Sequence, residues 1–323
     1  MRSLPYVTGA AAAAAAVVVL AAAPVAADDS GFTIQDPRIT ESSGLAASRV
    51  HPGIYWTHND QDEPRVFAVD SKTGKTVATI TLSGVGKPRD MEAISVGTDG
   101  NVYVGDIGDN LNGSWDHVWI YRFTEPKTLK DMTVRAKQYT VKYADGARNA
   151  EAMMVHPKTG RVYIASKNED GGGLYEGPET LSPTRTNVFR RMGEVPWVTD
   201  GAFSPDGKEL VLRSYFSARG YEWKNRGLGA DHRVSAPIQG QAESVTYTAD
   251  GKALMFGSEG EQSEVKRVPL GKESVSEGGS KSPSENGSPA AEDSDRSSFM
   301  YGLIVLAGAT ALVFGVKRLL RRD

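Results

Sequence analysis

The chain has 323 residues, a formal net charge of −3 and no cysteine. A slightly acidic balance argues against a nucleic-acid partner, because phosphate binding needs a concentrated basic surface. Without cysteine, the chain can form no disulfide, no thiolate zinc site and no cysteine nucleophile.

Residues 1–27 have the layout of a secretory signal peptide. Arg2 precedes an apolar run rich in Ala, Val and Leu from Gly9 to Ala23, and small residues lead up to Asp28. This order of a basic start, a short apolar core and a small-residue cleavage site is typical of export signals. We predict cleavage after Ala27, with an uncleaved anchor as the alternative.

Residues 28–270 contain an internal repeat that predicts an all-β domain. Each copy reads as a short apolar strand, a tight turn that contains glycine, and a second strand rich in Val, Tyr, Ile and Leu. The copies are spaced by roughly 40 to 60 residues, which is the range of propeller blades. Their turns are Asp99-Gly100, Thr159-Gly160, Asp206-Gly207 and Asp250-Gly251, and their anchor positions are Ser43, Glu92, Glu151, Asp200 and Glu243.

Further strand-like runs after several copies bring each repeat to four strands, which is the plan of a β-propeller blade. We predict five blades, or six if one of the long repeats contains another, with a β-sandwich as the alternative fold. The last copy is one strand short, whereas the strand-like segment Gly31–Gln35 precedes the first copy without a partner. We therefore expect the N-terminal strand to complete the last blade and close the ring.

The C-terminal part predicts a membrane anchor. Residues 271–298 are rich in Ser, Gly, Glu, Lys and Pro and should form a disordered stalk. Residues 299–316 are uncharged and mostly apolar, close to the ~20 residues that a transmembrane helix needs. The basic tail at 317–323 favours a cytoplasmic C-terminus, with the β domain outside the cell and the protein in the cell membrane. The alternative is a buried core helix.

Polar residues at the strand ends predict one acidic mouth of the propeller channel. In such a hairpin, the start of the first strand and the end of the second lie at the same edge. The ends of the second strands add Asp60, Lys167, Arg213 and Glu259 to this edge. The predicted metal ligands are Glu92, Glu151, Asp200 and Glu243, and the predicted ligand-binding residues are Glu41, Asp90, Asp106, Asp109, Asn110 and Asn149.

The sequence is compatible with two interpretations of these carboxylates. Hard oxygen ligands suit Ca²⁺, which binds 6–8 oxygens. Alternatively, the carboxylates belong to a structural network of ion pairs, since converging carboxylates stay ionised only when positive groups neutralise them. The basic partners would be Arg38, Arg89, Arg148 and Lys167.

His58 is the candidate general base, because carboxylates flank it and its ordinary pKa lies near neutrality. A hydrogen-bonding role within its loop is the alternative. Trp197 and three other tryptophans could stack on a sugar at the mouth or pack in the core. None of the common hydrolase or phosphate-binding motifs is present in the sequence.

Four segments carry a resemblance to a known family. They are Glu41-Ser-Ser-Gly-Leu-Ala, Tyr55-Trp-Thr-His-Asn-Asp, Asp90-Met-Glu-Ala-Ile and Tyr103-Val-Gly-Asp-Ile-Gly-Asp-Asn. With them, the domain resembles secreted, membrane-anchored propeller proteins of actinobacteria that are described as WD-repeat-like. More distantly, the acidic mouth is similar to that of the Ca²⁺-dependent β-propeller phytases and gluconolactonases. Those enzymes have six blades, and the phosphate-clamping residues of the phytases find no match here.

Together these features predict a cell-surface recognition module that binds an extracellular ligand or envelope protein at its acidic mouth. One alternative is a Ca²⁺-dependent hydrolase of phosphoesters or lactones that uses the same carboxylates, and another is a passive scaffold within an envelope complex.

Overall fold

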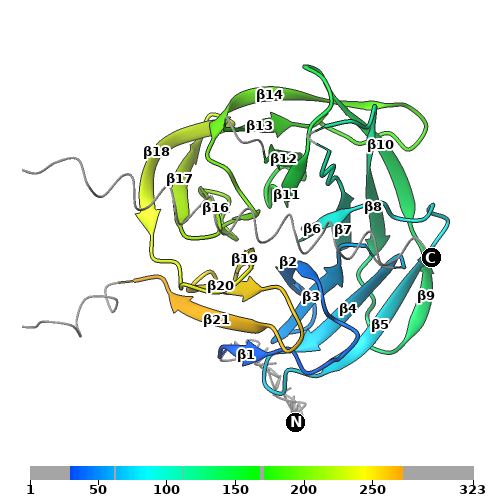
Figure 1. Cartoon of the computed structure of the whole chain (residues 1–323), viewed down its shortest axis with the longest axis vertical. Helices are drawn as coiled ribbons and strands as arrows, with labels where there is room; N and C mark the ends of the chain where they lie inside the picture. Colours follow the sequence, from blue (N-terminus) through cyan, green and yellow to red (C-terminus); the bar gives the residue numbers. More distant parts are fainter. Residues whose placement is uncertain (1–29, 62, 112, 168–170, 272–323) are drawn as a thin grey trace, which may run out of the picture. The chain divides into compact units, whose positions relative to one another are not determined.

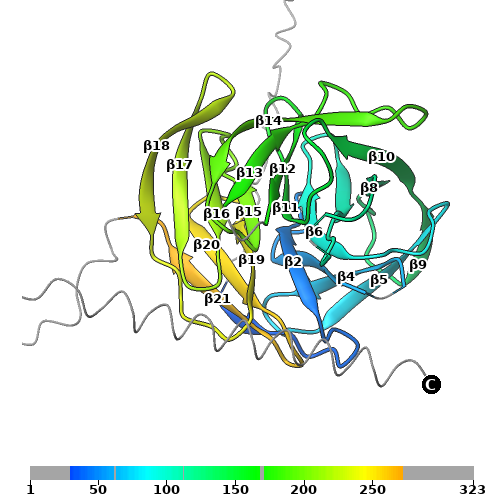
Figure 2. The ribbon, with the colours of Figure 1, turned by 45° about the horizontal axis from the view of Figure 1, so that its top comes forward.

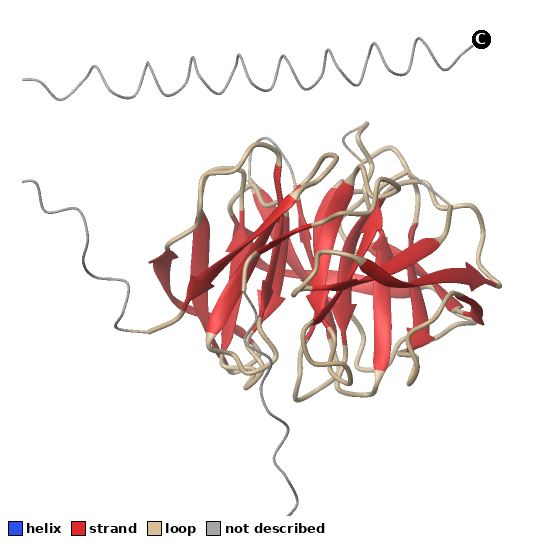
Figure 3. Cartoon of the chain, turned by 90° about the horizontal axis from the view of Figure 1, so that it is seen from below, coloured by secondary structure: helices blue, strands red, loops and turns tan. Residues whose placement is uncertain are grey.

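The computed structural model describes residues 30–61, 63–111, 113–167 and 171–271. The regular secondary structure in these ranges consists of β-strands alone (Figure 3), so the predicted all-β fold is confirmed. None of the described residues forms a helix of membrane-spanning length and apolarity. The predicted signal peptide, transmembrane helix and tail, and the predicted stalk beyond residue 271, lie outside the described residues.

The strands form five four-stranded antiparallel units that are arranged as a propeller-like ring (Figure 1). Unit 1 contains β2 (Ser42–Ala47), β3 (Ile54–Asn59), β4 (Arg65–Asp70) and β5 (Thr76–Ser83). Unit 2 contains β6 (Met91–Val96), β7 (Asn101–Asp106), β8 (Val118–Thr124) and β10 (Lys137–Tyr143). Unit 3 contains β11 (Ala150–Val155), β12 (Val162–Ser166), β13 (Gly172–Glu176) and β14 (Asn187–Val195).

Unit 4 contains β15 (Asp200–Phe203), β16 (Glu209–Arg213), β17 (Ala218–Lys224) and β18 (Gly227–Val234). Unit 5 contains β19 (Ala242–Tyr247), β20 (Ala253–Ser258), β21 (Glu264–Pro269) and the N-terminal β1 (Phe32–Thr33). The first strands β2, β6, β11, β15 and β19 each contact the next, and β19 contacts β2, so that the ring is closed. Each copy of the sequence repeat therefore corresponds to one four-stranded unit of the fold.

The apolar core is divided among the interfaces between neighbouring units. Each of the five hydrophobic clusters among the described residues joins two adjacent units, and the cluster around Trp56 and Tyr121, for example, joins units 1 and 2. The first strands are mostly buried, and every residue of β11 and β19 is buried. This explains why these strands read as continuous apolar runs without alternation.

The predicted turns have the conformation that their glycines suggested. Gly100, Gly160, Gly207 and Gly251 all have positive φ, between 68° and 73°. Glycine reaches this region without the steric cost that a Cβ atom brings. The Asp-Gly and Thr-Gly turns thus set the hairpin of each repeat.

The ring closes where the sequence predicted it. β1 pairs antiparallel with β21, with Phe32 opposite Val265. Beyond β1, the Ile34 N–H donates to the Ser263 carbonyl (2.9 Å) and the Gln35 N–H donates to the Gly74 carbonyl (2.8 Å). The N-terminal segment therefore links unit 5 to the β4–β5 turn of unit 1.

Gly74 offers a test of this closure. We expect Gly74→Ala to lower the free energy of unfolding by about 3 kcal/mol. Gly74 has a φ of +67°, and an added Cβ would collide with the Thr33 carbonyl oxygen in β1. The control is Gly100→Ala, where φ is +73° but nothing lies within 4 Å of the new Cβ. Urea unfolding followed by tryptophan fluorescence compares the two, and equal losses would contradict a role for Gly74 at the closure.

Two strands of the segment 132–143 join neighbouring units at the perimeter (Figure 2). β9 (Met132–Arg135) lies parallel to β5 of unit 1, whereas β10, which completes unit 2, pairs in parallel with β14 of unit 3. Units 2 and 3 thereby form one eight-stranded sheet. This crossing of outer strands links units 1, 2 and 3 by backbone hydrogen bonds, in addition to their side-chain packing.

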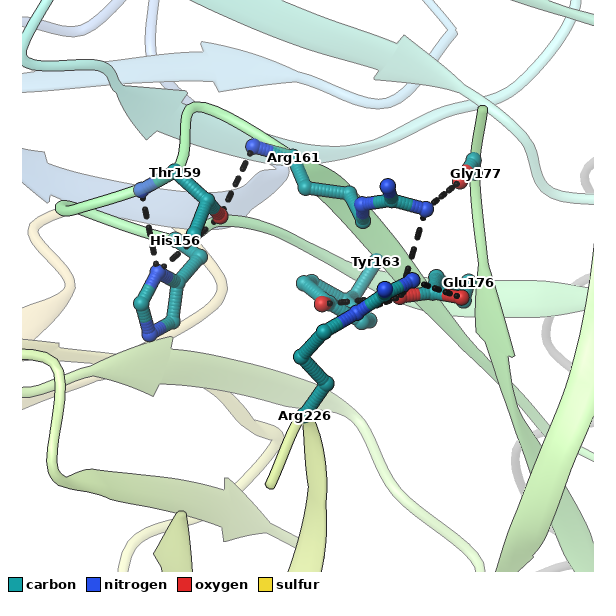
Figure 4. Close-up of polar contacts among 7 residues, drawn as sticks. All are labelled: His156, Thr159, Arg161, Tyr163, Glu176, Gly177 and Arg226. Carbon is teal, nitrogen blue, oxygen red and sulfur yellow. Dashed lines mark hydrogen bonds and ion pairs between the residues drawn. The ribbon is translucent and has the colours of Figure 1, made fainter. Parts of the chain in front are cut away.

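Polar contacts fasten unit 3 to unit 4 (Figure 4). Glu176 of β13 accepts a hydrogen bond from the Tyr163 hydroxyl (3.2 Å) and another from Arg226 (2.9 Å), which comes from the β17–β18 turn of unit 4. Arg161 lies 3.3 Å from the same carboxylate. Nearby, His156 Nε2 donates to the Gly207 carbonyl (3.1 Å) of unit 4 while its Nδ1 accepts from the Thr159 N–H (3.3 Å). His156 is thus a structural residue of this interface.

Candidate functional site

β-Bulges place the anchor residues of four units. In β2, β6, β11 and β19, the pairing with the second strand skips one residue, and the skipped residues are Ser43, Glu92, Glu151 and Glu243. A bulge removes a residue from the ladder and redirects its side chain. Unit 4 has no bulge here, because Asp200 pairs in register with Arg213.

Lys167 acts on all three bulged glutamates, and Arg213 also acts on Glu243. The Lys167 Nζ lies 3.1 Å from Glu151 Oε1, and Glu92 and Glu243 contribute to the field that holds its pKa well above the ordinary value against the effect of burial. Of the predicted basic partners, Lys167 pairs with the anchor residue Glu151. Arg38 and Arg148 instead pair with Asp36 and Asp145. Arg89 stacks between Trp115 and Trp119, with ring centroids at 4.1 and 3.9 Å.

One lysine does not balance this many carboxylates. Burial, with Glu151 and Asp106 nearby, raises the pKa of Asp90 to about 7. Burial and Glu151 also raise the pKa of Glu243 to about 8, against the opposing effect of Lys167, and the pKa of Glu92 lies well above its ordinary range for the same reasons. Near neutral pH, this cluster therefore contains carboxyl groups that retain protons until a positive group approaches.

A second group of three carboxylates lies at the same end of the strands. Glu41, Asp60 and Glu259 each offer an oxygen within 4.8 Å of the others. Burial and the adjacent Glu41 raise the pKa of Asp60 to about 9. Among the described residues, this spacing is compatible with a shared metal ion such as Ca²⁺, whereas the predicted set of Glu92, Glu151, Asp200 and Glu243 stays a prediction. Within the predicted set, the ammonium group of Lys167 lies 3.1 Å from Glu151 Oε1.

Asp200 differs from the other anchors in its contacts. Its Oδ2 accepts the Val245 N–H of β19 (2.8 Å), and the residue is only 1% exposed. Its strand partner Arg213 is equally buried and donates to the carbonyls of Ser244 (2.6 Å) and Gly257 (2.7 Å). Both side chains thus form hydrogen bonds across the interface between units 4 and 5. Asp200 takes this role because unit 4 lacks the bulge that redirects the anchor side chain in the other units.

The other predicted ligand-binding residues divide into two groups. Asp90 lies near Glu151, as its raised pKa indicates, and accepts a hydrogen bond from Asn110 (3.0 Å). Asp106 instead accepts the Asp90 N–H (2.8 Å) and the Tyr121 hydroxyl (2.5 Å), so its carboxylate fixes the start of β6.

Asp109 and Asn149 are likewise occupied with backbone groups. Asp109 accepts the Trp115 N–H (2.6 Å) and the Ser114 hydroxyl (3.0 Å), which orders the loop after β7. Asn149 accepts the Asp109 N–H (2.9 Å) and so joins units 2 and 3.

His58 lies inside the protein. Its side chain is 0% exposed, and burial lowers its pKa to about 4, so the ring is neutral at physiological pH. Its Nε2 lies close to Gly44 of β2, where an added Cβ would be 2.9 Å away. The candidate general base therefore has no exposed surface from which to contact a substrate.

Aromatic residues of unit 4 lie beside Lys167. The Tyr215 hydroxyl accepts a hydrogen bond from Lys167 Nζ (3.0 Å), and the ring of Trp197 lies 5.9 Å from the same atom. Trp197 was among the aromatic candidates of the sequence, but Tyr215 was missed. Its only signal is its position two residues after Arg213, at the end of a second strand.

No family model and no curated protein matches this chain. Solved structures with β-propeller-like folds match at low identity. They include a chain of the mitotic checkpoint complex (12% identity, TM-score 0.38, 71% of this chain and 63% of that one), an auxiliary nutrient binding protein from Bacteroides thetaiotaomicron (11%, 0.40, 71% and 57%) and hydrazine synthase from Kuenenia stuttgartiensis (16%, 0.39, 68% and 56%). The chain thus spans less than two thirds of each of these structures, and similarity this weak carries no information about function.

Proposed function

We propose that the protein is a five-bladed β-propeller that binds a positively charged ligand at its acidic mouth, and that the predicted C-terminal helix anchors it at the cell surface. The observation that carries this proposal is that Lys167 pairs with Glu151 while Glu92 and Glu243 lie close enough to act on its charge. Three bulges direct these side chains, and a folded domain gains no stability from carboxylates that retain protons at neutral pH. A cationic ligand would stabilise their charged forms.

The favoured ligand is an organic cation, such as a basic side chain of a peptide or envelope protein. Tyr215 and Trp197 flank the acidic groups, and aromatic faces attract ammonium and guanidinium groups. Phe216 is 48% exposed and Ile238 is 85% exposed in the loops after β16 and β18. Aromatic residues such as Phe216 are enriched in protein–protein interfaces relative to the rest of a protein surface.

The alternative is a Ca²⁺-dependent hydrolase, and the spacing of Glu41, Asp60 and Glu259 favours the metal part of it. If Ca²⁺ binds, these three residues would hold it and the ion would polarise a bound phosphoester or lactone. The candidate base His58 is fully buried, so this proposal has no assigned base among the predicted residues. Turnover of any substrate in a panel of phosphoesters and lactones in the presence of Ca²⁺ would support the hydrolase alternative.

Binding is tested with the full chain in detergent and a fluorescein-labelled hexalysine. We expect saturable binding that weakens as salt is added, because the attraction is electrostatic. The double variant Glu92→Gln/Glu151→Gln should lose most of the affinity. The control removes two exposed carboxylates, Glu194→Gln/Glu222→Gln, and should bind as the wild type does. Equal binding by both double variants, or none by the wild type, would refute the proposal.

A further inference from the structure

Lys167 occupies a small group of side chains that we call the ammonium cage, formed by Glu151 of unit 3 and by Trp197 and Tyr215 of unit 4. The backbone N–H of Lys167 donates to the Asn149 carbonyl (2.9 Å), which fixes the residue directly after β12. Its Nζ lies 3.1 Å from Glu151 Oε1 and donates to the Tyr215 hydroxyl at 3.0 Å. The three contacting side chains thus come from two units and meet at this one atom.

The aromatic part of the cage is specific to unit 4. Trp197 lies before β15 and Tyr215 after β16, and their rings are in edge contact with centroids 6.1 Å apart. The Nζ of Lys167 lies 5.1 Å from the Tyr215 centroid and 5.9 Å from the Trp197 centroid. Unit 4 is also the unit whose anchor residue, Asp200, stays in the strand ladder. The groups that unit 4 places beside Lys167 are therefore the two aromatic rings and not its anchor carboxylate.

This combination of one carboxylate, one hydroxyl acceptor and two aromatic rings suits a primary ammonium group. The side chain of Lys167 is only 15% exposed, and a buried charge is tolerated only where such partners compensate for lost hydration. The protein therefore already contains an ammonium group at the mouth to which we assign its ligand.

We propose that Lys167 is a tethered occupant of a ligand subsite, and that the ammonium group of a cationic ligand displaces it from the ammonium cage. This inference rests on the proposed function of the mouth and names the chemical class of its ligand, a primary amine such as a lysine side chain. A tethered group competes at a high effective concentration, so it lowers the apparent affinity of the ligand. Lys167 is then a built-in competitor that sets the affinity of the mouth.

The test uses the full chain in detergent and compares Lys167→Ala with the wild type. We expect labelled hexalysine to bind about tenfold more tightly to the variant, because the competitor is gone and the cage is open. Hexaarginine should gain less, since a guanidinium group is larger and planar. The control Lys208→Ala removes an 82% exposed lysine and should change neither affinity. An equal gain for both peptides would mean a general charge effect and overturn the cage.

A second measurement does not depend on the peptide. Propylammonium chloride should raise the thermal midpoint of Lys167→Ala and leave that of the wild type unchanged, whereas propanol should raise neither. If Lys167→Ala does not fold, Lys167→Met removes the ammonium group but keeps an apolar stem, and the same tighter binding of hexalysine is expected. Unchanged or weaker binding of hexalysine by a folded variant would overturn the proposal. Failure of the wild type to bind hexalysine would instead refute the proposed function. The change in the thermal midpoint of Lys167→Ala with propylammonium would then still test whether the ammonium cage binds a primary amine.

Discussion

Glu243→Gln is expected to make the protein more stable at pH 8.5 and to leave its stability unchanged at pH 4. The pKa of Glu243 in the folded protein is raised from 4.5 to about 8, mainly by burial and then by Glu151 and Glu259. A raised carboxyl pKa favours the folded state at low pH, and this contribution is lost as the pH rises through the folded value. The shift corresponds to about 5 kcal/mol, which the uncharged amide would recover at high pH.

Urea unfolding at the two pH values measures this difference. All five tryptophans of the sequence lie in the described ring, so their fluorescence reports its unfolding in the full chain. Glu194→Gln is the matched control, because that carboxylate is 91% exposed. A loss of stability at pH 8.5 would show that Glu243 is held ionised by partners and that the mouth is a balanced network of ion pairs. The same variant should bind hexalysine more weakly, so that stability and binding change in opposite directions.

Arg213→Met is expected to lower the free energy of unfolding by about 3–5 kcal/mol. Arg213 is 1% exposed and its guanidinium group donates to the Ser244 and Gly257 carbonyls and to Gln239 Oε1 (3.0 Å). Ser244 directly follows the bulge of β19, so the arginine of unit 4 satisfies carbonyls beside the bulge of unit 5. Methionine fills much of the volume but leaves these acceptors buried without a donor.

Thermal or urea unfolding checks this expectation against Arg219→Met, which removes an arginine that is 53% exposed and pairs with Asp231. The control should lose less than about 1 kcal/mol, as exposed ion pairs do. If both variants lose the same amount, the buried hydrogen bonds of Arg213 contribute nothing beyond a surface contact. Because Glu243 is the bulged residue itself, Arg213→Met should also weaken the binding of hexalysine.

The sequence predicted those features that depend on local or periodic patterns. The glycine turns, the repeat of strand pairs and the unpaired strand at Gly31–Gln35 are visible in the chain, and the structure has positive φ at Gly100, Gly160, Gly207 and Gly251 and β1 paired with β21. These features follow from backbone conformation and strand count, which need no knowledge of side-chain direction.

The composition of the mouth could not be predicted in the same way. Whether an anchor leaves the ladder depends on a bulge, and a bulge depends on pairing across two strands, so Glu243 and Asp200 look equivalent in the sequence while only the first is bulged. The carboxylates of Asp106 and Asp109 bind backbone N–H groups that are close only in the folded chain. Tyr215 belongs to a loop without any motif, and its role depends on the neighbouring unit.

The pairing of β1 with β21 also constrains how the molecule can fold. Its partners Phe32 and Val265 lie at opposite ends of the described chain, so nearly the whole domain must be synthesised before this contact can form. Contacts between distant segments form slowly, because the intervening chain must lose much of its conformational freedom first. Until then, the edge of β21 stays unpaired and open to other chains. Docking of the two-residue β1 is therefore expected to be the last and slowest step of folding. We expect the protein to be most prone to aggregation before this step is complete.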